Sequence, residues 1–219
     1  EKEAGRFGMG TVSAGQIGEA IAKAAHDGML VSRTFLDKRG AEFAGFTTAD
    51  NVAQERQVLR SEAAGRGAVA PILSVRQAAM AIVRAELLSE HGWNAGQRAA
   101  TRALLLSTDR VTGVQGYAGT AKTTTVLATF AREAVTRGLK VTALAPTASA
   151  AQTLGDALGL RGDTVARHLL SNSSDQRGGV WIVDEASMLS ARDMASLLDR
   201  SAKAGARVVL VGDVKHLGS

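Results

Sequence analysis

Four short apolar runs, separated by segments of helical length, constrain the fold of this 219-residue chain more than any other feature of its sequence. Two of them, Val180–Val183 and Val208–Val211, are continuously apolar, which is typical of parallel strands that helices cover on both faces. Trp181 lies inside such a run, and we expect it and Trp93 to belong to the core. The pattern predicts an α/β fold, with strands at 110–115, 140–145, 180–184 and 206–211 and helices near 122–137, 148–158 and 190–204.

The first half of the chain has a different pattern, of helices with one hairpin. Turn residues at 37–40 lie between two strand-like runs, 29–35 and 41–46, which predicts a β-hairpin. Capping residues and apolar spacing predict helices that begin after Ser13, at Thr48 and after Ser74, the last running to about Glu90. We expect two domains, a helical region with a hairpin over 1–92 and an α/β domain over 93–219.

The composition excludes several classes of function. The chain has no cysteine, which excludes thiol catalysis, thiolate metal sites and disulfides, and its four histidines are too scattered to suggest a zinc cluster. No apolar run approaches the ~18–20 residues that cross a bilayer, and the N-terminus lacks a signal-peptide pattern, so we expect a cytoplasmic protein. Because the chain begins with Glu1 and ends with Ser219 just after an apolar strand, we expect a piece of a longer protein.

A near match to the loop that binds polyphosphates lies between the first predicted strand and helix of the α/β part, at residues 116–123. In such a loop, backbone N–H groups surround the phosphates, and the small residues here are Gly116, Gly119, Thr120 and Ala121. Lys122 would reach the β and γ phosphates, and the Thr123 hydroxyl would bind Mg²⁺. Ala121 replaces the glycine of the motif, at a cost of about 1 kcal/mol if the position requires positive φ. Taken alone, the segment also fits a tight turn between strand and helix.

Acidic residues follow two later strands of the predicted sheet. Asp184 and Glu185 follow one strand, and Asp213 follows Gly212 at the end of the next. The carboxyl ends of parallel strands meet at one edge, where ligands bind in open α/β folds. Asp184 would hold Mg²⁺, and Glu185 would accept a proton from an attacking water. An isolated Asp-Glu pair also fits a solvated turn, but the shared edge with the phosphate loop favours a nucleotide site.

Together these motifs resemble the first motor domain of RecD-like, superfamily 1 helicases, and most closely the helicase part of TraI-type conjugative relaxase-helicases. The resemblance extends from roughly Gly28 to the end of the chain, and its closest segments are 114–119 and 184–188. It implies a P-loop, RecA-like parallel sheet with helices on both faces, preceded by a small, mostly helical region with a hairpin. It also implies that ATP and Mg²⁺ bind, and that ATP hydrolysis drives movement along single-stranded DNA in plasmid conjugation.

The resemblance assigns residues outside the phosphate loop as well. Gln97 corresponds to the glutamine that reads the adenine base, although its spacing from Asn94 also fits a capping box. Thr147 corresponds to a hydroxyl that contacts the phosphates of single-stranded DNA. Thr164, with Arg167 and His168, corresponds to the next DNA-contacting segment, which also fits a capped surface helix.

The last motif departs from the family. RecD-like proteins have Gly-Asp-x-x-Gln-Leu, and this chain keeps Asp213 but has His216 at the glutamine position. In the family that glutamine links the γ-phosphate to DNA movement, so its replacement concerns coupling more than binding. The resemblance places Asp213 and His216 among the nucleotide-binding residues.

The chain ends just after this motif, so the resemblance implies that a second motor domain and a relaxase domain belong to a longer chain. Because the arginine finger lies in the second motor domain, we expect the isolated chain to hydrolyse ATP slowly at best. With 4% aromatic residues, DNA binding is expected to be salt-sensitive and sequence-tolerant. The alternatives are a helicase-derived DNA-binding or scaffolding module without turnover, and a P-loop ATPase of another branch, against which Gln97 and Asp213 argue.

Overall fold

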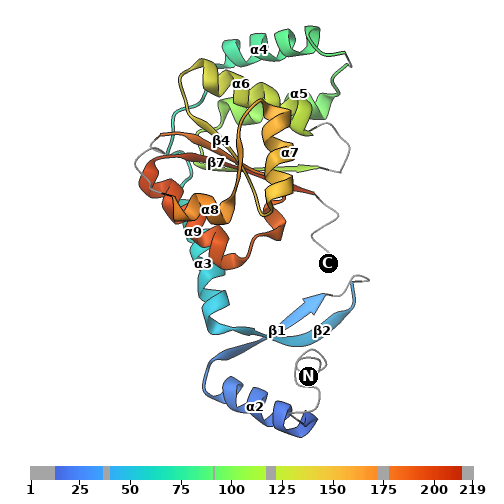
Figure 1. Ribbon diagram of the computed structural model, residues 1–219, viewed down its shortest axis with the longest axis vertical. Coiled ribbons are helices and arrows are strands. Elements are labelled where there is room, and N and C mark those ends of the chain that lie inside the picture. Colours follow the sequence, from blue (N-terminus) through green and yellow to red (C-terminus); the bar gives the residue numbers. More distant parts are fainter. Residues whose placement is uncertain (1–12, 37–39, 91, 117–121, 172–177, 214–219) are drawn as a thin grey trace. The chain divides into compact units, whose positions relative to one another are not determined.

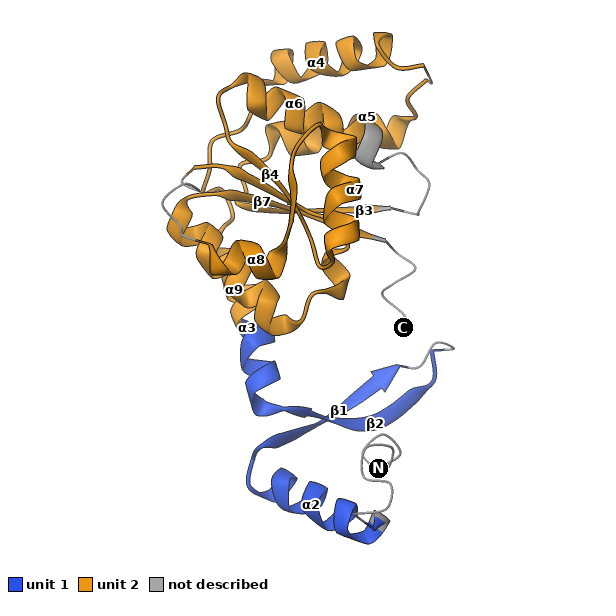
Figure 2. Ribbon diagram, viewed as in Figure 1, with its two compact units in different colours: residues 1–56, 218–219 blue, residues 57–217 orange. Residues whose placement is uncertain are grey.

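The computed structural model describes residues 13–36, 40–90, 92–116, 122–171 and 178–213, with only the backbone described at 14, 116, 122–124 and 213. The chain forms two compact units, one built from residues 1–56 with 218–219 and the other from 57–217 (Figure 2). These units are defined by contacts within the folded chain, whereas the predicted boundary between 92 and 93 separates sequence domains. That boundary stays a prediction.

The first unit contains a capped helix and a β-hairpin. Ser13 caps helix α2 (Ala14–His26): its Oγ accepts from the Gln16 N–H, and its own N–H donates to Gln16 Oε1, as expected for a capping box. Strands β1 (Leu30–Leu36) and β2 (Glu42–Thr48) pair antiparallel, which confirms the predicted hairpin. Helix α3 (Ala49–Ala64) begins in this unit and ends in the other.

The second unit is organised around a five-stranded parallel sheet. Its strand order is β3-β7-β6-β4-β5, and every pairing is parallel. The strands are β3 (Val111–Gly116), β4 (Val141–Ala145), β5 (Gly162–Thr164), β6 (Val180–Val183) and β7 (Arg207–Asp213). The α/β fold and the four predicted strands are confirmed. Strand β5 was not predicted, because its three residues contain no apolar run.

Helices cover both faces of this sheet (Figure 1). One face packs against α5 (Ala95–Leu106), α6 (Ala128–Thr136) and α7 (Ala148–Leu158), with α4 (Val75–Leu87) packed on α5 and α6, and the other face packs against α8 (Val165–Leu170) and α9 (Ala191–Ala204). Successive residues of β6 serve opposite faces, since Ile182 belongs to the first core and Trp181 to the second. Trp181 and Trp93 are buried, as predicted.

The predicted helix at 122–137 forms in two parts. Its first turn, η1 (Lys122–Leu127), has π-type hydrogen bonding, and only α6 after it is α-helical. Periodicity could not reveal the change, because both parts bury apolar residues such as Val126 and Phe130. The helix expected to reach Glu90 ends earlier, at Leu87.

Two ion pairs connect α4 to the helices beside it. Arg84 pairs with Glu133 of α6, and Glu86 pairs with Arg98 of α5 at 2.6 Å. Glu133 is buried, and Arg84, together with the more distant Arg132 and Arg137, compensates the charge of its carboxylate. Because Arg98 follows Gln97, the Glu86–Arg98 pair helps to fix the helix that carries the glutamine.

Candidate nucleotide-binding site

Three strand ends with chemically suitable residues lie side by side at the carboxyl edge of the sheet. Strand β7 lies between β3 and β6, and Gly116 at the end of β3 is the register partner of Asp213 at the end of β7. Strand β6 ends at Val183, the partner of Leu210, and Asp184 follows it directly. The structure thus brings the start of the phosphate-loop segment, the acidic pair and Gly212–Asp213 to one edge.

Asp184 is held in place by hydrogen bonds on both sides. Its N–H donates to the Leu144 carbonyl at 2.9 Å, which continues the pairing of β6 with β4 by one residue. Its Oδ1 accepts from the Glu185 N–H at 2.9 Å. The side chain is half-buried, and its position follows from the strand before it.

Glu185 adopts a backbone conformation that the sequence did not predict. Its φ of 51° and ψ of 35° make it the one non-glycine residue with positive φ among the described residues. This left-handed conformation costs an ordinary residue about 1–2 kcal/mol. The turn directs the chain from β6 into η3 (Ala186–Met188) and presents the Glu185 carboxylate, half-buried, at the sheet edge. Strain of this kind is often retained at functional sites.

Much of the phosphate loop lies outside the described residues. Gly119, Thr120, Ala121 and His216 belong to that part of the chain. Lys122 and Thr123 begin η1, but their side chains are not described, nor is that of Asp213. Their roles stay predictions. The described backbone gives their setting, in which a helix begins shortly after the carboxyl end of β3, an edge strand of the sheet.

Gln97 takes part in the capping box that its spacing predicted. Its side-chain oxygen accepts from the Asn94 N–H, and its own N–H donates to Asn94 Oδ1, both at 2.9 Å. The capping interpretation is confirmed, and recognition of adenine stays a prediction. The box fixes the direction of the half-buried Gln97 side chain at the start of α5.

Thr147 and Thr164 are the N-caps of α7 and α8. Thr147 Oγ1 accepts from the Ala150 N–H and Thr164 Oγ1 from the Arg167 N–H, both at 3.2 Å. Ala145 at the end of β4 pairs with Thr164 at the end of β5, so both threonines lie at the same sheet edge as Asp184. Their contact with DNA stays a prediction.

His168 is in the wrong place for the DNA contact suggested with Thr164. It is 3% exposed and packs edge-on against Trp181, with 4.5 Å between ring centroids. Burial, with a smaller contribution from Arg200, lowers the pKa of His168 to about 4. The imidazole is a neutral core group. His168 lies four residues after the Thr164 cap, in a helix of only six residues, which is too short for periodicity to show which residues are buried.

The carboxylates at this edge suit Mg²⁺, which takes few protein ligands, better than a metal ion that needs three or more protein side chains. Among the described residues, no three His, Cys, Asp or Glu side chains lie close enough together to form a metal site. Mg²⁺ usually takes one or two carboxylates and fills its other positions with phosphate oxygens and water. One oxygen of Asp184 accepts from Glu185, so the carboxylate still has a second oxygen for such a role.

Comparison with known proteins adds to this geometry. The sequence model of the family described as "AAA domain" matches residues 92–219, more than half of the chain. The chain belongs to the AAA domain family. In this AAA domain chain, the matched residues include the sheet edge with Gly116, Asp184 and Asp213. Over the residues that the structure describes, no helix is long and apolar enough to span a membrane.

Three relatives are similar to this chain over half of its length or more. The multifunctional conjugation protein TraI of Escherichia coli K12 is 32% identical over 208 residues, which cover 90% of this chain and 10% of TraI. The conjugal transfer protein TraA of Agrobacterium fabrum is 31% identical over 62% of this chain and 12% of TraA. The ATP-dependent RecD2 DNA helicase of Deinococcus radiodurans is 38% identical over 51% of this chain and 16% of RecD2. The predicted resemblance to a TraI-type, RecD-like motor domain is confirmed, and the chain spans only about a tenth of the TraI sequence.

Proposed function

We propose that this chain is the ATP-binding half of a DNA helicase motor, which couples ATP hydrolysis to movement along single-stranded DNA in conjugation. The observation that carries the proposal is the common sheet edge of Gly116, Asp184 and Asp213. Similarity to a conjugation protein, a conjugal transfer protein and a DNA helicase supports the process and the reaction. We take residues 93–219 as the motor domain.

The proposed chemistry divides between the two sides of strand β7. On the β3 side, Gly116, Gly119, Thr120 and Ala121 would surround the phosphates and Lys122 would compensate their charge. On the β6 side, Glu185 would accept the proton of the attacking water. Thr123 and Asp184 would hold Mg²⁺, which neutralises charge on the β and γ phosphates. Gln97, Asp213 and His216 would complete the nucleotide contacts.

The proposed DNA contacts use the same edge, further along the sheet. The exposed Thr147 and the half-buried Thr164 lie at helix N-termini, where hydroxyl and N–H groups suit phosphate oxygens. The chain carries a net charge of +5, which supports association with a polyanion. Binding should weaken steeply with salt and vary little between sequences of single-stranded DNA.

The proposed partners lie outside this chain. A motor of this type needs a second motor domain to supply the arginine finger, and a relaxase domain would share the polypeptide. The 90% coverage of this chain against 10% of TraI supports a place within a much larger protein.

Calorimetric titration of Mg²⁺-ATP into the chain tests the nucleotide site. We expect saturable binding that the Lys122→Ala variant loses and that a Lys203→Ala variant keeps. Lys203 is a suitable control, because it is an exposed lysine of α9 that pairs only with nearby Asp199, at 2.6 Å, in the described part of the chain.

Absence of binding by the folded parent chain would contradict the proposal and favour the scaffolding alternative. A second titration, of single-stranded oligonucleotides at increasing salt, separates the two activities. DNA binding that does not depend on salt, or that is tight for one duplex sequence, would contradict the proposed DNA contacts.

A further inference from the structure

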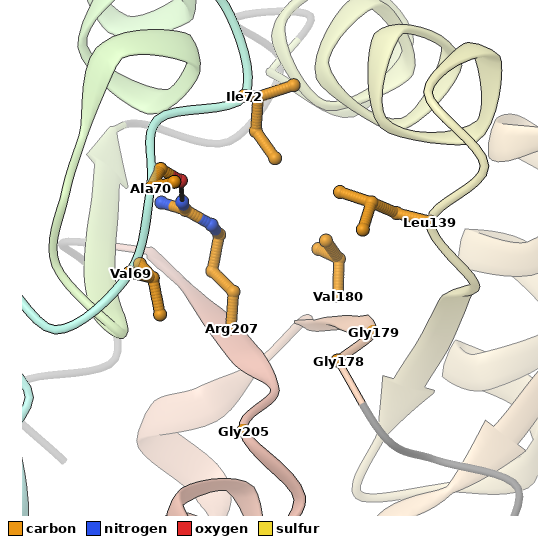
Figure 3. Close-up of a pocket in the computed structure, with 9 residues that line it drawn as sticks. All are labelled: Val69, Ala70, Ile72, Leu139, Gly178, Gly179, Val180, Gly205 and Arg207. Atoms are coloured by element: carbon orange, nitrogen blue, oxygen red, sulfur yellow. Dashed lines mark hydrogen bonds between the residues drawn. The ribbon is translucent and has the colours of Figure 1, made fainter.

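A pocket lies at the edge of the sheet opposite the nucleotide site. It has a volume of about 250 Å³ and lies where β6 and β7 begin. Five apolar side chains and three glycines line it, together with one charged residue: Val69, Ala70, Ile72, Leu139, Val180, Gly178, Gly179, Gly205 and Arg207 (Figure 3). Asp184 is four residues along β6 from Val180, a distance of about 13 Å at the usual rise, so the two sites are separate.

The charged residue is a buried arginine without a carboxylate partner. Arg207 is 4% exposed, and among the described residues it forms no ion pair. Its Nη1 donates to the carbonyls of Ser107 at 2.9 Å and Asp109 at 3.3 Å, and its Nη2 donates to the Ala70 carbonyl at 2.7 Å. These acceptors are neutral, and a buried cation is normally paired with an anion.

Two of the five N–H groups of this guanidinium have no acceptor within the described part of the chain. The three carbonyls account for both hydrogens of Nη1 and one of Nη2, which leaves the Nε–H and the second Nη2 hydrogen. A guanidinium presents such donors in a planar fork that matches a carboxylate. In Figure 3 the arginine side chain forms one wall of the pocket and its end reaches Ala70.

Asp109, whose negative charge acts on Arg207, does not fill this role. The Asp109 carboxylate accepts from the Gly67 N–H at 2.8 Å, and it raises the pKa of Arg207 by less than burial lowers it. The pKa of Arg207 is therefore lowered overall. An anion in the pocket would supply the compensation that Asp109 does not.

We propose that this pocket binds a short-chain aliphatic carboxylate, such as butanoate, whose oxygens accept from the two remaining N–H groups of Arg207. The aliphatic part would contact Leu139, Val180 and Ile72, whose side chains point into the pocket in Figure 3. The pocket is slightly smaller than the ~300 Å³ at which sites for drug-sized ligands begin, which suits a small ligand. Binding here does not depend on the proposed nucleotide function.

NMR titration of the ¹⁵N-labelled chain with sodium butanoate tests the proposal at neutral pH. We expect saturable shifts of the amides at 178–180 and 205–207, and at least tenfold weaker binding of butan-1-ol, which has the same apolar part without the charge. Sodium chloride at matched concentration controls for ionic strength. Equal binding of the alcohol, or no saturable shift with butanoate, would overturn the proposal.

Two variants locate the binding. Arg207→Gln removes the charge and should weaken butanoate at least tenfold. Because the loss of Arg207 also removes three hydrogen bonds and can prevent folding, Leu139→Phe provides a second test that keeps the arginine and fills the pocket. Val135→Phe is its matched control, an apolar residue of α6 that is 49% exposed. Unchanged binding by Leu139→Phe would overturn the proposal.

A carboxylate of the chain itself is the competing occupant. Asp175 precedes the pocket's glycines in the sequence and lies outside the described residues. If Asp175→Asn bound butanoate and the parent chain did not, the anion of the pocket would be internal and the proposal would be overturned. Equal binding by both chains would support it.

Discussion

At position 185 the glycine variant should be more stable than the alanine variant. At an ordinary helical position the order is the reverse, because alanine is the more stabilising residue there. Both changes remove the same carboxylate, so the difference between the two variants reports the backbone alone. At φ 51°, alanine bears the left-handed penalty of about 1–2 kcal/mol, which glycine avoids. Glycine loses about 0.5–1 kcal/mol through the greater freedom of its unfolded chain. The glycine variant should therefore be more stable by about 1 kcal/mol.

The control is a position with ordinary helical geometry. Ala202 is an exposed residue of α9, and Ala202→Gly should lower the free energy of unfolding by about 1 kcal/mol. The glycine-minus-alanine difference should thus change sign between the two positions. Urea unfolding can be followed by fluorescence, because both tryptophans of the chain are buried in the unit formed by 57–217.

An alanine variant at 185 that is as stable as the glycine variant would refute the reasoning, because the fold would then not impose positive φ there. If the expected order is found, the natural glutamate is retained despite its conformational cost. The proposed function further predicts that both variants lose ATP hydrolysis when a second motor domain is present, since neither has a group at position 185 to accept the proton.

Two further predictions concern the core of the second unit. The pKa of His168 is about 4 in the folded chain and 6.5, the ordinary histidine value, in the unfolded chain. Between these two pH values the unfolded state binds more protons than the folded state, so the free energy of unfolding decreases as the pH falls. Unfolding at about pH 7.5 and about pH 5 should differ by about 2 kcal/mol more in the parent than in His168→Gln, and equal pH dependence would contradict the depressed pKa. Gly162→Ala would place a Cβ 1.7 Å from the Ala151 carbonyl oxygen and should cost upward of about 3 kcal/mol. Gly113→Ala, where no atom lies within 4 Å of the added Cβ, should change urea stability little, and similar losses for both would show that α7 and β5 are not in tight contact.

Elements whose signal lies in a few neighbouring residues could be predicted from the sequence. Capping residues such as Ser13, Ser74 and Asn94 marked helix starts, because each satisfies an N–H three residues later. The run around Trp181 indicated a buried strand, because residues facing both cores must be apolar.

The features that the sequence did not reveal depend on contacts between distant segments. Strand β5 exists because Gly162 can lie against the backbone of α7, and its own residues have no strand pattern. The burial of His168 depends on Trp181, which is thirteen positions away in sequence and on another element. The positive φ of Glu185 follows from the turn between β6 and η3 and contradicts the preference of glutamate.

Structural and functional roles of the capping residues are compatible, because they use different parts of the same side chain. Thr147 Oγ1 uses an acceptor position for the Ala150 N–H, and a hydroxyl also has one hydrogen to donate. A DNA phosphate accepts hydrogen bonds, so the cap and the proposed contact do not compete. The same reasoning applies to Gln97, whose oxygen serves the cap while its amide group carries donors of the kind that an adenine nitrogen accepts. Confirmation of a capping box is therefore no argument against either proposed contact, and the cap orients the group that would make it.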